Sequence, residues 1–511
     1  MPLVIGLVLA SAPFGSAWAQ VDDEFEFERP TEDAIVEMFA ETTSTLDQGR
    51  KTVAADMLLE IIEDPEQRNF HAEAYARLGR ILLDLDLPYA ALISLEKALA
   101  IDPEGVATST VTAIELADSV GDTALLEEVF AQNLGLDVDA ATRSRMAYLA
   151  AREAQRNGNY GTALAILTMV RDSDPFFPEA MALYGVVLTL QGRATDAIDP
   201  FQTALRVGEE NGKDDRFRNI VTMNLARAYF TSENFPRAIE NYAMVDRESR
   251  QWPEAEFERA WAHFRLNDMN GTIGLLQDHS GPFFADAYFP EAYLLRIYSL
   301  ILMCKFTEAH EEIDLFKERY EPQLALLTTA ATLTPTEFFS QMRLHEENQR
   351  HRLPPMVTWL FESEDRFNDG LTAVRHAEDE MNRLRNISAN PFSLAAMNWV
   401  RDRRDTIIEQ EGARMRGRVG LMVDELDQMI ADSEMSKLDI MSMESSLYEM
   451  ASVTGEMPEA QRRVRRSVRV RPGYREWPFE GEYWADEAGY YRANAVPECP
   501  ESLRMGGSNP E

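Results

Sequence analysis

The sequence predicts an all-α protein whose main part is a solenoid of stacked helix pairs. Of its 511 residues, 45% are hydrophobic, and the stretches between glycines and prolines lack the alternation typical of strands. Two segments also repeat one pattern of small and apolar residues, with Met181 standing 34 positions after Ala147. A period of about 34 residues is typical of stacked helix–turn–helix units. The two patterns are Ala147, Ala150, Ala151, Ala154, Ala163, Leu167 and Val170, and Met181, Tyr184, Gly185, Leu188, Ala197, Phe201 and Ala204.

Residues 1–19 are predicted to be a signal peptide. Leu3 to Ala10 form an apolar run, and Ala17-Trp18-Ala19 places small residues at both positions that a signal peptidase requires before Gln20. The usual positive charge near the start is missing, and a buried helix is the alternative, although glycine and proline interrupt this stretch. No cysteine near the cleavage point offers a lipid attachment site, and no later run reaches the ~18 apolar residues of a membrane span. We therefore expect a periplasmic or secreted chain after cleavage near Ala19.

Residues 20–322 are predicted to form the solenoid. Antiparallel helices packed ~8–10 Å apart leave room only for small side chains where they cross. The first helices carry Gly79, Ala151, Gly185 and Ala226 at this crossing, and the second helices carry Ala91, Ala163, Ala197 and Ala238. Less regular units are expected near 106–143 and 253–285, with a weaker helix pair at 34–65. The clearest units are 72–105, 144–177, 178–211, 219–252 and 290–323.

This pattern resembles the tetratricopeptide repeat family over residues 72–322. The resemblance implies a right-handed solenoid whose first helices line a concave surface, and it implies that this surface binds proteins or peptides. The unit 72–105 carries the family pattern with Tyr75, Leu78-Gly79, Leu82, Ala91, Leu95, Ala98 and Pro103.

The resemblance also identifies candidate protein-binding residues on the concave surface. Arg80, Arg152 and Arg227 occupy one such position in three units. A guanidinium group binds a carboxylate through two parallel hydrogen bonds, so these arginines are candidates for clamping a partner. The alternative is that they neutralise carboxylates of the same chain. Tyr148, Arg156 and Phe230 accompany them.

Residues 323–455 are predicted to form a long helical hairpin with a coiled-coil-like seam. Apolar residues recur there every three or four positions in two runs, which Asn390-Pro391 separates with a natural helix break. We interpret this as an antiparallel hairpin that joins the two runs, with self-association through the seam as the alternative. The first run is Phe367, Leu371, Val374, Met381 and Leu384, and the second is Met415, Val419, Met422, Leu426 and Met429.

Residues 456–511 are predicted to be an arginine-rich segment followed by an irregular aromatic tail. The six arginines of 461–472 either fold back on the acidic body or dock on an anionic surface such as lipid headgroups or cell-wall polymer. The aromatic residues within 477–491 must pack on this chain or on another, and we expect Trp477, Phe479, Tyr483 and Trp484 to contribute to protein binding. With residues 282–284 and 289–295, this segment is similar to exported envelope and gliding-motility-associated tetratricopeptide repeat proteins of deltaproteobacteria.

The charge and the cysteine content limit the possible ligands and structural roles further. The net charge of −37 argues against nucleic acid as a ligand and favours solubility and basic partner proteins. Export would permit a disulfide between Cys304 and Cys499. Cys304 nevertheless sits in an apolar helical run after Leu300, which favours a buried, unpaired cysteine. Two cysteines are too few for a structural zinc site with the usual four ligands.

No motif predicts an enzyme, a cofactor site or a metal site. The sequence has no phosphate-binding glycine loop, and His345 and His351, six positions apart, are expected on different sides of a helix. We therefore predict a non-enzymatic protein–protein interaction scaffold of the bacterial cell envelope, with other envelope proteins or peptides as partners. The alternative is a module that binds cell wall or another anionic polymer through its arginine-rich segment and aromatic tail.

Overall fold

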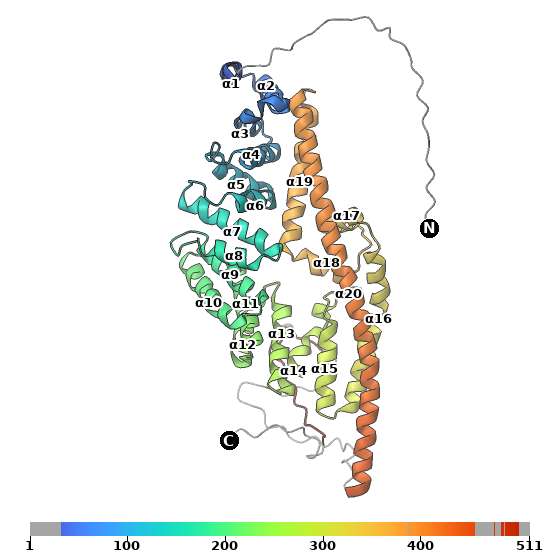
Figure 1. The fold of residues 1–511 in the computed structure, drawn as a ribbon. Helices are drawn as coiled ribbons and strands as arrows, with labels where there is room; N and C mark the ends of the chain where they lie inside the picture. The colour runs from blue at the N-terminus through green and yellow to red at the C-terminus, as the bar shows by residue number, and fades with distance from the viewer. Residues whose placement is uncertain (1–31, 388, 455–474, 476–481, 485, 500–511) are drawn as a thin grey trace, which may run out of the picture.

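The computed structural model describes residues 32–387, 389–454, 475, 482–484 and 486–499. Within these residues every regular element is a helix and no strand occurs, which confirms the predicted all-α fold. The predicted signal peptide, the arginine run at 461–472, and Trp477 and Phe479 lie outside the described residues. Figure 1 shows a curved stack of short helices beside one very long helix.

The stack consists of α1 to α16, arranged as eight antiparallel pairs. Each helix contacts the next one in sequence, so every pair buries its apolar face against its neighbours. The segments expected to be irregular, 106–143 and 253–285, form helix pairs like the rest. The helices are α1 (Glu32–Asp47), α2 (Lys51–Glu63), α3 (His71–Asp84), α4 (Pro88–Ile101), α5 (Ser109–Val120), α6 (Ala124–Gln132), α7 (Ala140–Arg156), α8 (Tyr160–Leu167), α9 (Phe177–Leu190), α10 (Ala194–Glu210), α11 (Asp215–Thr231), α12 (Phe235–Tyr242), α13 (Trp252–Arg265), α14 (Met269–Leu276), α15 (Pro290–Leu302) and α16 (Phe306–Ala331).

The same turn joins the two helices of every pair. One residue of each turn adopts a left-handed backbone, with φ between 54° and 78°. The amide after it donates to a carbonyl five positions earlier, as Asn159 N does to Ala154 O at 2.8 Å, which closes the end of the first helix. Glycine takes this conformation without strain, and it fills four of the eight turns. The turn residues are Gly49, Asp86, Gly121, Gly158, Gly192, Glu233, Asn267 and Cys304.

Small residues let the two helices of a pair cross closely. A Cβ atom added to Gly185 would lie 2.6 Å from the ring of Phe201, and one added to Gly79 would lie 2.7 Å from the side chain of Leu95. Neither position therefore has space for a larger residue. The alanines expected at the crossings are fully buried, namely Ala91, Ala151, Ala163, Ala197, Ala226 and Ala238.

The stack ends later than predicted. α16 continues through Pro322 to Ala331, so the expected boundary at 322 lies inside a helix. Pro322 is exposed, and at such a position a proline bends a helix without ending it, because water satisfies the freed carbonyl. Two short helices, α17 (Pro335–Glu346) and α18 (Pro355–Glu362), then lead to α19 (Asp365–Asn386) and α20 (Pro391–Thr454).

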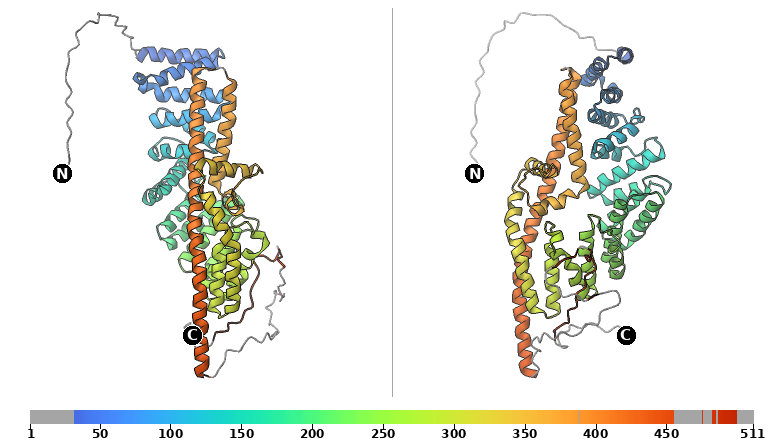
Figure 2. Two further views of the ribbon diagram at one scale, coloured as in Figure 1. Left: turned by 90° about the vertical axis from the view of Figure 1, so that its right-hand side faces the viewer. Right: turned by 180° about the vertical axis from the view of Figure 1, so that it is seen from behind.

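The antiparallel pair α19 and α20, called the brace below, connects the two ends of the stack. The 64 residues of α20 correspond to about 96 Å of helix. Along this length α20 contacts α2 and α4 in the first units, and α15, α16 and α17 at the other end. Figures 1 and 2 show α20 running almost the full height of the molecule beside the curved stack.

The predicted hairpin is present, but its two apolar runs do not pair with each other. α19 packs on the first part of α20, where Gly370 lies against Ile407. The second run is buried against the end of the stack instead, and the Tyr288 hydroxyl donates to the carbonyl of Met422 at 3.2 Å. Residues at equal distances from the turn face each other in an antiparallel hairpin, so α20 beyond Gly412 has no counterpart in α19. The expected seam between the two runs was therefore wrong.

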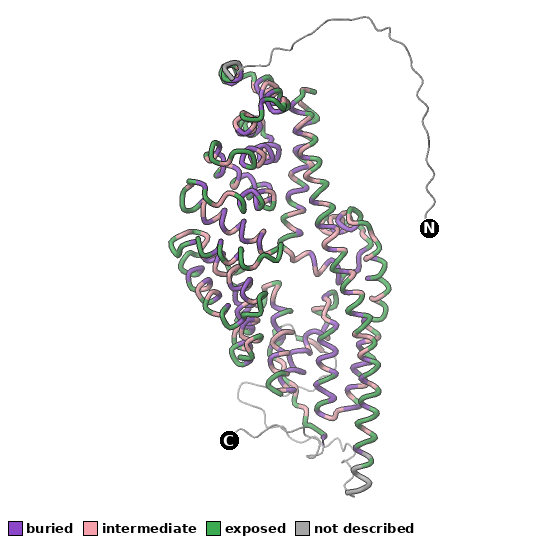
Figure 3. Tube along the Cα trace, viewed as in Figure 1, coloured by how far each residue is buried: buried purple, intermediate pink, exposed green. Residues whose placement is uncertain are grey.

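The brace caps a helix of the second unit. α4 follows Leu87, whose side chain cannot accept a hydrogen bond from the free amides of the first turn. The carboxylate of Glu380 on α19 accepts these bonds from Tyr89 N and Ala90 N, both at 2.7 Å. Burial raises the pKa of Glu380 to about 7, although the two amides act in the opposite direction. The brace and the neighbouring units bury every residue from Tyr89 to Leu95 (Figure 3).

A second buried contact joins α20 to the turn before α6. The Arg403 guanidinium donates to both oxygens of Asp122, with Nε–Oδ2 and Nη2–Oδ1 distances of 2.7 Å and 2.6 Å. Asp122 is 3% exposed and also accepts from the Tyr89 hydroxyl at 2.8 Å. Burial and the adjacent Asp122 carboxylate raise the pKa of Tyr89, so the hydroxyl keeps its proton and donates. A charge can be buried here because it is paired and hydrogen-bonded.

Candidate protein-binding surfaces

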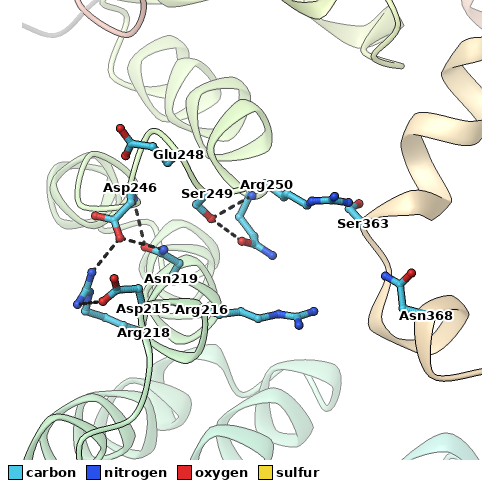
Figure 4. Close-up of a pocket in the computed structure, with 11 residues that line it drawn as sticks. Asp215, Arg216, Arg218, Asn219, Asp246, Glu248, Ser249, Arg250, Ser363 and Asn368 are labelled. Atoms are coloured by element: carbon cyan, nitrogen blue, oxygen red, sulfur yellow. Dashed lines mark hydrogen bonds and ion pairs between the residues drawn. The ribbon is translucent and has the colours of Figure 1, made fainter. Parts of the chain in front are cut away.

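A polar cavity of about 680 Å³ lies between the middle of the stack and the C-terminal helices. The start of α11 and the connection from α12 to α13 form one wall, and residues after α18 and in α19 form the other. Arg216, Arg218 and Arg250 line the cavity with side chains that are 55%, 53% and 58% exposed. Figure 4 shows Arg216 and Arg250 reaching across it from the stack. The other lining residues are Asp215, Asn219, Asp246, Glu248, Ser249, Gln251, Ser363 and Asn368.

Two of these arginines link the cavity walls. Arg250 Nη1 donates to the carbonyl of Glu362 at 2.9 Å, and Arg216 pairs with Asp365 at the start of α19. Each guanidinium has five N–H donors, so one carboxylate does not saturate it. The cavity can therefore supply further hydrogen bonds to an anionic group without losing the contact between its walls.

Arg218 is held within the stack instead. Its Nη2 lies 2.8 Å from Asp246, and Asn219 Nδ2 donates to the same carboxylate oxygen at 3.0 Å. The hydrogen bond from Asn219 lowers the pKa of Asp246, which is therefore ionised at neutral pH. This fixes the orientation of Arg218 at the rim of the cavity.

The predicted arginines on α7 pair with a carboxylate of the same chain. Arg152 Nη2 lies 2.7 Å from the buried Glu127, and Arg156 contacts the other oxygen of that carboxylate. Burial raises the pKa of Asp369 on α19, and the nearby Arg152 opposes this shift. Arg152 therefore lies on the side of α7 that faces the brace.

The other two predicted arginines have different surroundings. Arg227 on α11 lies 2.8 Å from Glu254 and 2.7 Å from Glu258 of α13, so it links two units of the stack. Arg80 is exposed, with Nη2 at 3.5 Å from the Thr108 hydroxyl. The geometry thus favours internal neutralisation for Arg227, as for the arginines of α7, and partner binding by this row stays a prediction.

The predicted aromatic residues of the stack pack mainly on neighbouring rings. Tyr148 stacks on Phe176 at a centroid distance of 6.2 Å, and Phe230 meets Phe235 edge to face at 5.4 Å. Both are only half-buried and keep one edge at the surface. From the tail, Tyr483 accepts a hydrogen bond from Gln277 Nε2 at 3.3 Å, and Trp484 is 51% exposed.

Cys304 and Cys499 form a disulfide, so the expectation of an unpaired cysteine was wrong. α15 ends at Leu302, and Cys304 lies in the following turn with φ at 54°. The apolar run before Cys304 therefore belongs to the helix, whereas the cysteine itself does not. The bond attaches the C-terminal segment 486–499 to the turn between α15 and α16.

His345 and His351 are also closer together than expected. α17 ends at Glu346, and a turn with Asn348 at φ 53° returns the chain, so that His345 Nδ1 lies 3.3 Å from His351 Nε2. In the part of the chain that the structure describes, no three metal-ligating side chains gather in one place.

Among the described residues, no helix combines the length and hydropathy needed to cross a membrane.

Comparison with known proteins agrees with the fold. The family model described as Tetratricopeptide repeat matches residues 148–214, which run from the middle of α7 to the end of α10 and the turn that follows it. The match covers the central part of the stack. No curated protein matches the chain significantly.

Two solved structures show distant similarity to the chain. A Rap protein complexed with competence and sporulation factor is 12% identical, with a TM-score of 0.28 over 69% of this chain and 100% of that one. A Naa15/Naa10 complex bound to HypK-THB is 13% identical, with a TM-score of 0.32 over 82% of this chain and 62% of that one.

Sequence reasoning missed the arginines that line the cavity. Arg216 and Arg218 lie where the repeat is interrupted, since Ala197 and Ala238 are separated by 238 − 197 = 41 positions rather than 34. The extra residues form the polar connection before α11, and Arg216 lies in the first turn of that helix. An insertion of charged residues between two pattern positions was the available signal for a specialised surface.

Proposed function

We propose that the chain is a non-enzymatic scaffold that binds partner proteins of the bacterial cell envelope. The helical stack and the tetratricopeptide repeat match within it support a role in protein–protein interaction. The observation that carries the proposal is the polar cavity, where Arg216, Arg218 and Arg250 stay more than half exposed. Their guanidinium groups can receive the carboxylates of a partner segment in bidentate geometry.

Two features support a location in the envelope. The predicted signal peptide at 1–19 would direct the chain through the export pathway. The disulfide between Cys304 and Cys499 suits an oxidising compartment such as the periplasm, because cytosolic reductants keep thiols reduced. Detection of the mature chain in the periplasmic fraction, starting near Gln20, tests this location.

A charge reversal tests the binding site. Arg218→Glu changes the cavity without touching a residue that links its walls, and Arg206→Glu on α10 is the matched control, an exposed arginine that pairs with Glu210. The tagged full-length chain should lose at least tenfold in recovery of its main envelope partner with Arg218→Glu and none with Arg206→Glu. Equal recovery by both variants, with unchanged circular dichroism, would rule out the cavity as the binding site.

A further inference from the structure

The C-terminal segment 486–499 lies along α13, α14 and α15 without forming a helix or a strand. We propose that this surface is a binding site for an extended peptide and that segment 486–499, called the tail here, occupies it. Reduction of the Cys304–Cys499 disulfide opens the site to a segment of a partner protein with the same chemistry. The inference rests on the proposed scaffold function, because it assumes that the stack binds other proteins.

The surface holds the main chain of the tail. The carbonyl of Asn270 accepts from Ala493 N at 3.0 Å. The side chain of Asn270 accepts from Ala495 N at 2.8 Å and donates to Ala495 O at 3.1 Å. One residue therefore makes three main-chain contacts, and contacts of this kind give affinity to extended peptides irrespective of their side chains.

Two further residues shape this surface for a passing backbone. A Cβ atom added to Gly274 on α14 would lie 2.5 Å from the Cα atom of Arg492, so only glycine lets the tail approach. Asp278 is 1% exposed, and its carboxylate accepts from Gly489 N at 2.7 Å. A buried carboxyl group is costly without a hydrogen-bond partner, and the main chain of the tail supplies one.

Side chains define the peptide that fits. Arg492 donates to both oxygens of Asp268 at 2.7 Å and 2.9 Å. The Arg247 guanidinium of the surface lies 5.6 Å from the centre of the Tyr490 ring. In the tail, this aromatic residue stands two positions before Arg492. Gly489 has a left-handed backbone with φ at 82°, which favours glycine at this position. The surface therefore selects glycine, then an aromatic residue, then arginine at the spacing of Gly489, Tyr490 and Arg492.

The disulfide keeps the tail in place. Cys499 lies four residues after Ala495, so the bond holds the tail at the site with a very high effective concentration and excludes a free competitor. A dithiol reductant cleaves the bond by thiol–disulfide exchange, in which the dithiol is oxidised to its own disulfide and Cys304 and Cys499 each gain one electron and one proton. Only the weaker non-covalent contacts then oppose an incoming peptide.

A labelled peptide with the sequence of residues 486–498 tests the site on the full-length chain by fluorescence polarisation. The chain with Cys499→Ser and Ala495→Pro has an opened site, because the first change removes the disulfide and the second removes the amide that Asn270 binds. It should bind the peptide at least tenfold more tightly than the oxidised wild-type chain does. A peptide that carries Ala495→Pro is the matched control and should bind at least tenfold more weakly.

Three outcomes would overturn the inference. The opened chain, with its folding verified by circular dichroism, does not bind the peptide; or it binds both peptides equally; or hydrogen exchange at Gly489, Ala493 and Ala495 in the wild-type chain is as slow after reduction as before. A chain that binds the peptide but captures no envelope protein would contradict the proposed scaffold function and leave the peptide site standing.

Discussion

Replacement of Arg403 by methionine should release the brace from the first units of the stack. The change removes the guanidinium that donates to both oxygens of Asp122. Among the described residues, the Tyr89 hydroxyl is then the hydrogen-bond partner that this carboxylate, 3% exposed, retains. Breaking one side of a buried pair costs about 3–5 kcal/mol. The cost should fall on the local opening of α4 and α19, because these two helices contact each other only while the brace is docked on the stack.

Native-state hydrogen exchange followed by mass spectrometry is the suitable assay, since a chain of this length need not unfold in one step. Exchange in α4 should accelerate by a factor of roughly 10² to 4 × 10³, because about 1.4 kcal/mol corresponds to a factor of ten. Arg401→Met is the control, since Arg401 is on the same helix and 46% exposed, with its nearest carboxylate at 3.8 Å. Acceleration below tenfold, or equal to that of the control, would refute the reasoning. Adding Asp122→Asn to Arg403→Met should restore most of the protection.

Two further predictions concern packing and pH. Gly185→Leu should destabilise the chain by about 1–3 kcal/mol in thermal unfolding, because its new Cβ atom would meet the ring of Phe201, whereas Gly161→Leu, which has open space, should change little. Glu380→Gln should flatten the pH dependence of brace docking. The folded-state pKa of Glu380, about 7, lies above the ordinary value of 4.5. The contribution of Glu380 to the stability of brace docking is therefore fully present below about pH 4.5 and is lost as the pH rises through about 7. Between these pH values the free energy of local opening of α4, measured by hydrogen exchange, should fall by on the order of 3 kcal/mol in the wild-type chain relative to Glu380→Gln. Parallel pH profiles of the two chains would contradict the role of Glu380.

The repeat architecture was predictable because its determinants are local. The small residues at the helix crossings, such as Gly185, recur in the sequence with the period of the units. The break at Asn390-Pro391 likewise follows from local backbone preferences, and α19 and α20 end and begin on either side of it. Both features need only neighbouring residues or the next unit, so a single sequence carries them.

The docking of the brace depends on contacts that no local pattern encodes. Glu380 caps α4 from 291 residues away along the chain, and an acidic residue on a helix surface has no feature that predicts such a role. One indirect signal existed, because α4 has no charged residue from Tyr89 to Leu95, as expected for a helix covered on every side. The sequence showed that something must cover α4 without showing what.

The disulfide was mispredicted for a related reason. Cys304 follows an apolar run and was placed inside a helix, whereas it occupies the left-handed turn position that Gly158 and Gly192 take in other units. Alignment of the turns would have placed it correctly. Its partner, Cys499, lies in a segment outside the repeat, where no periodicity fixes its location.

Photo-crosslinking from the cavity tests the proposed binding site most directly. A benzoylphenylalanine in place of Glu248, an exposed residue of the cavity wall, should crosslink in the native envelope to a protein that depends on Arg218 for its recovery. The same group in place of Arg206, an exposed residue of α10 that is not part of the cavity lining, should not crosslink to that protein. Crosslinking from Arg206 alone, or equally from both positions, would show that partners do not bind in the cavity.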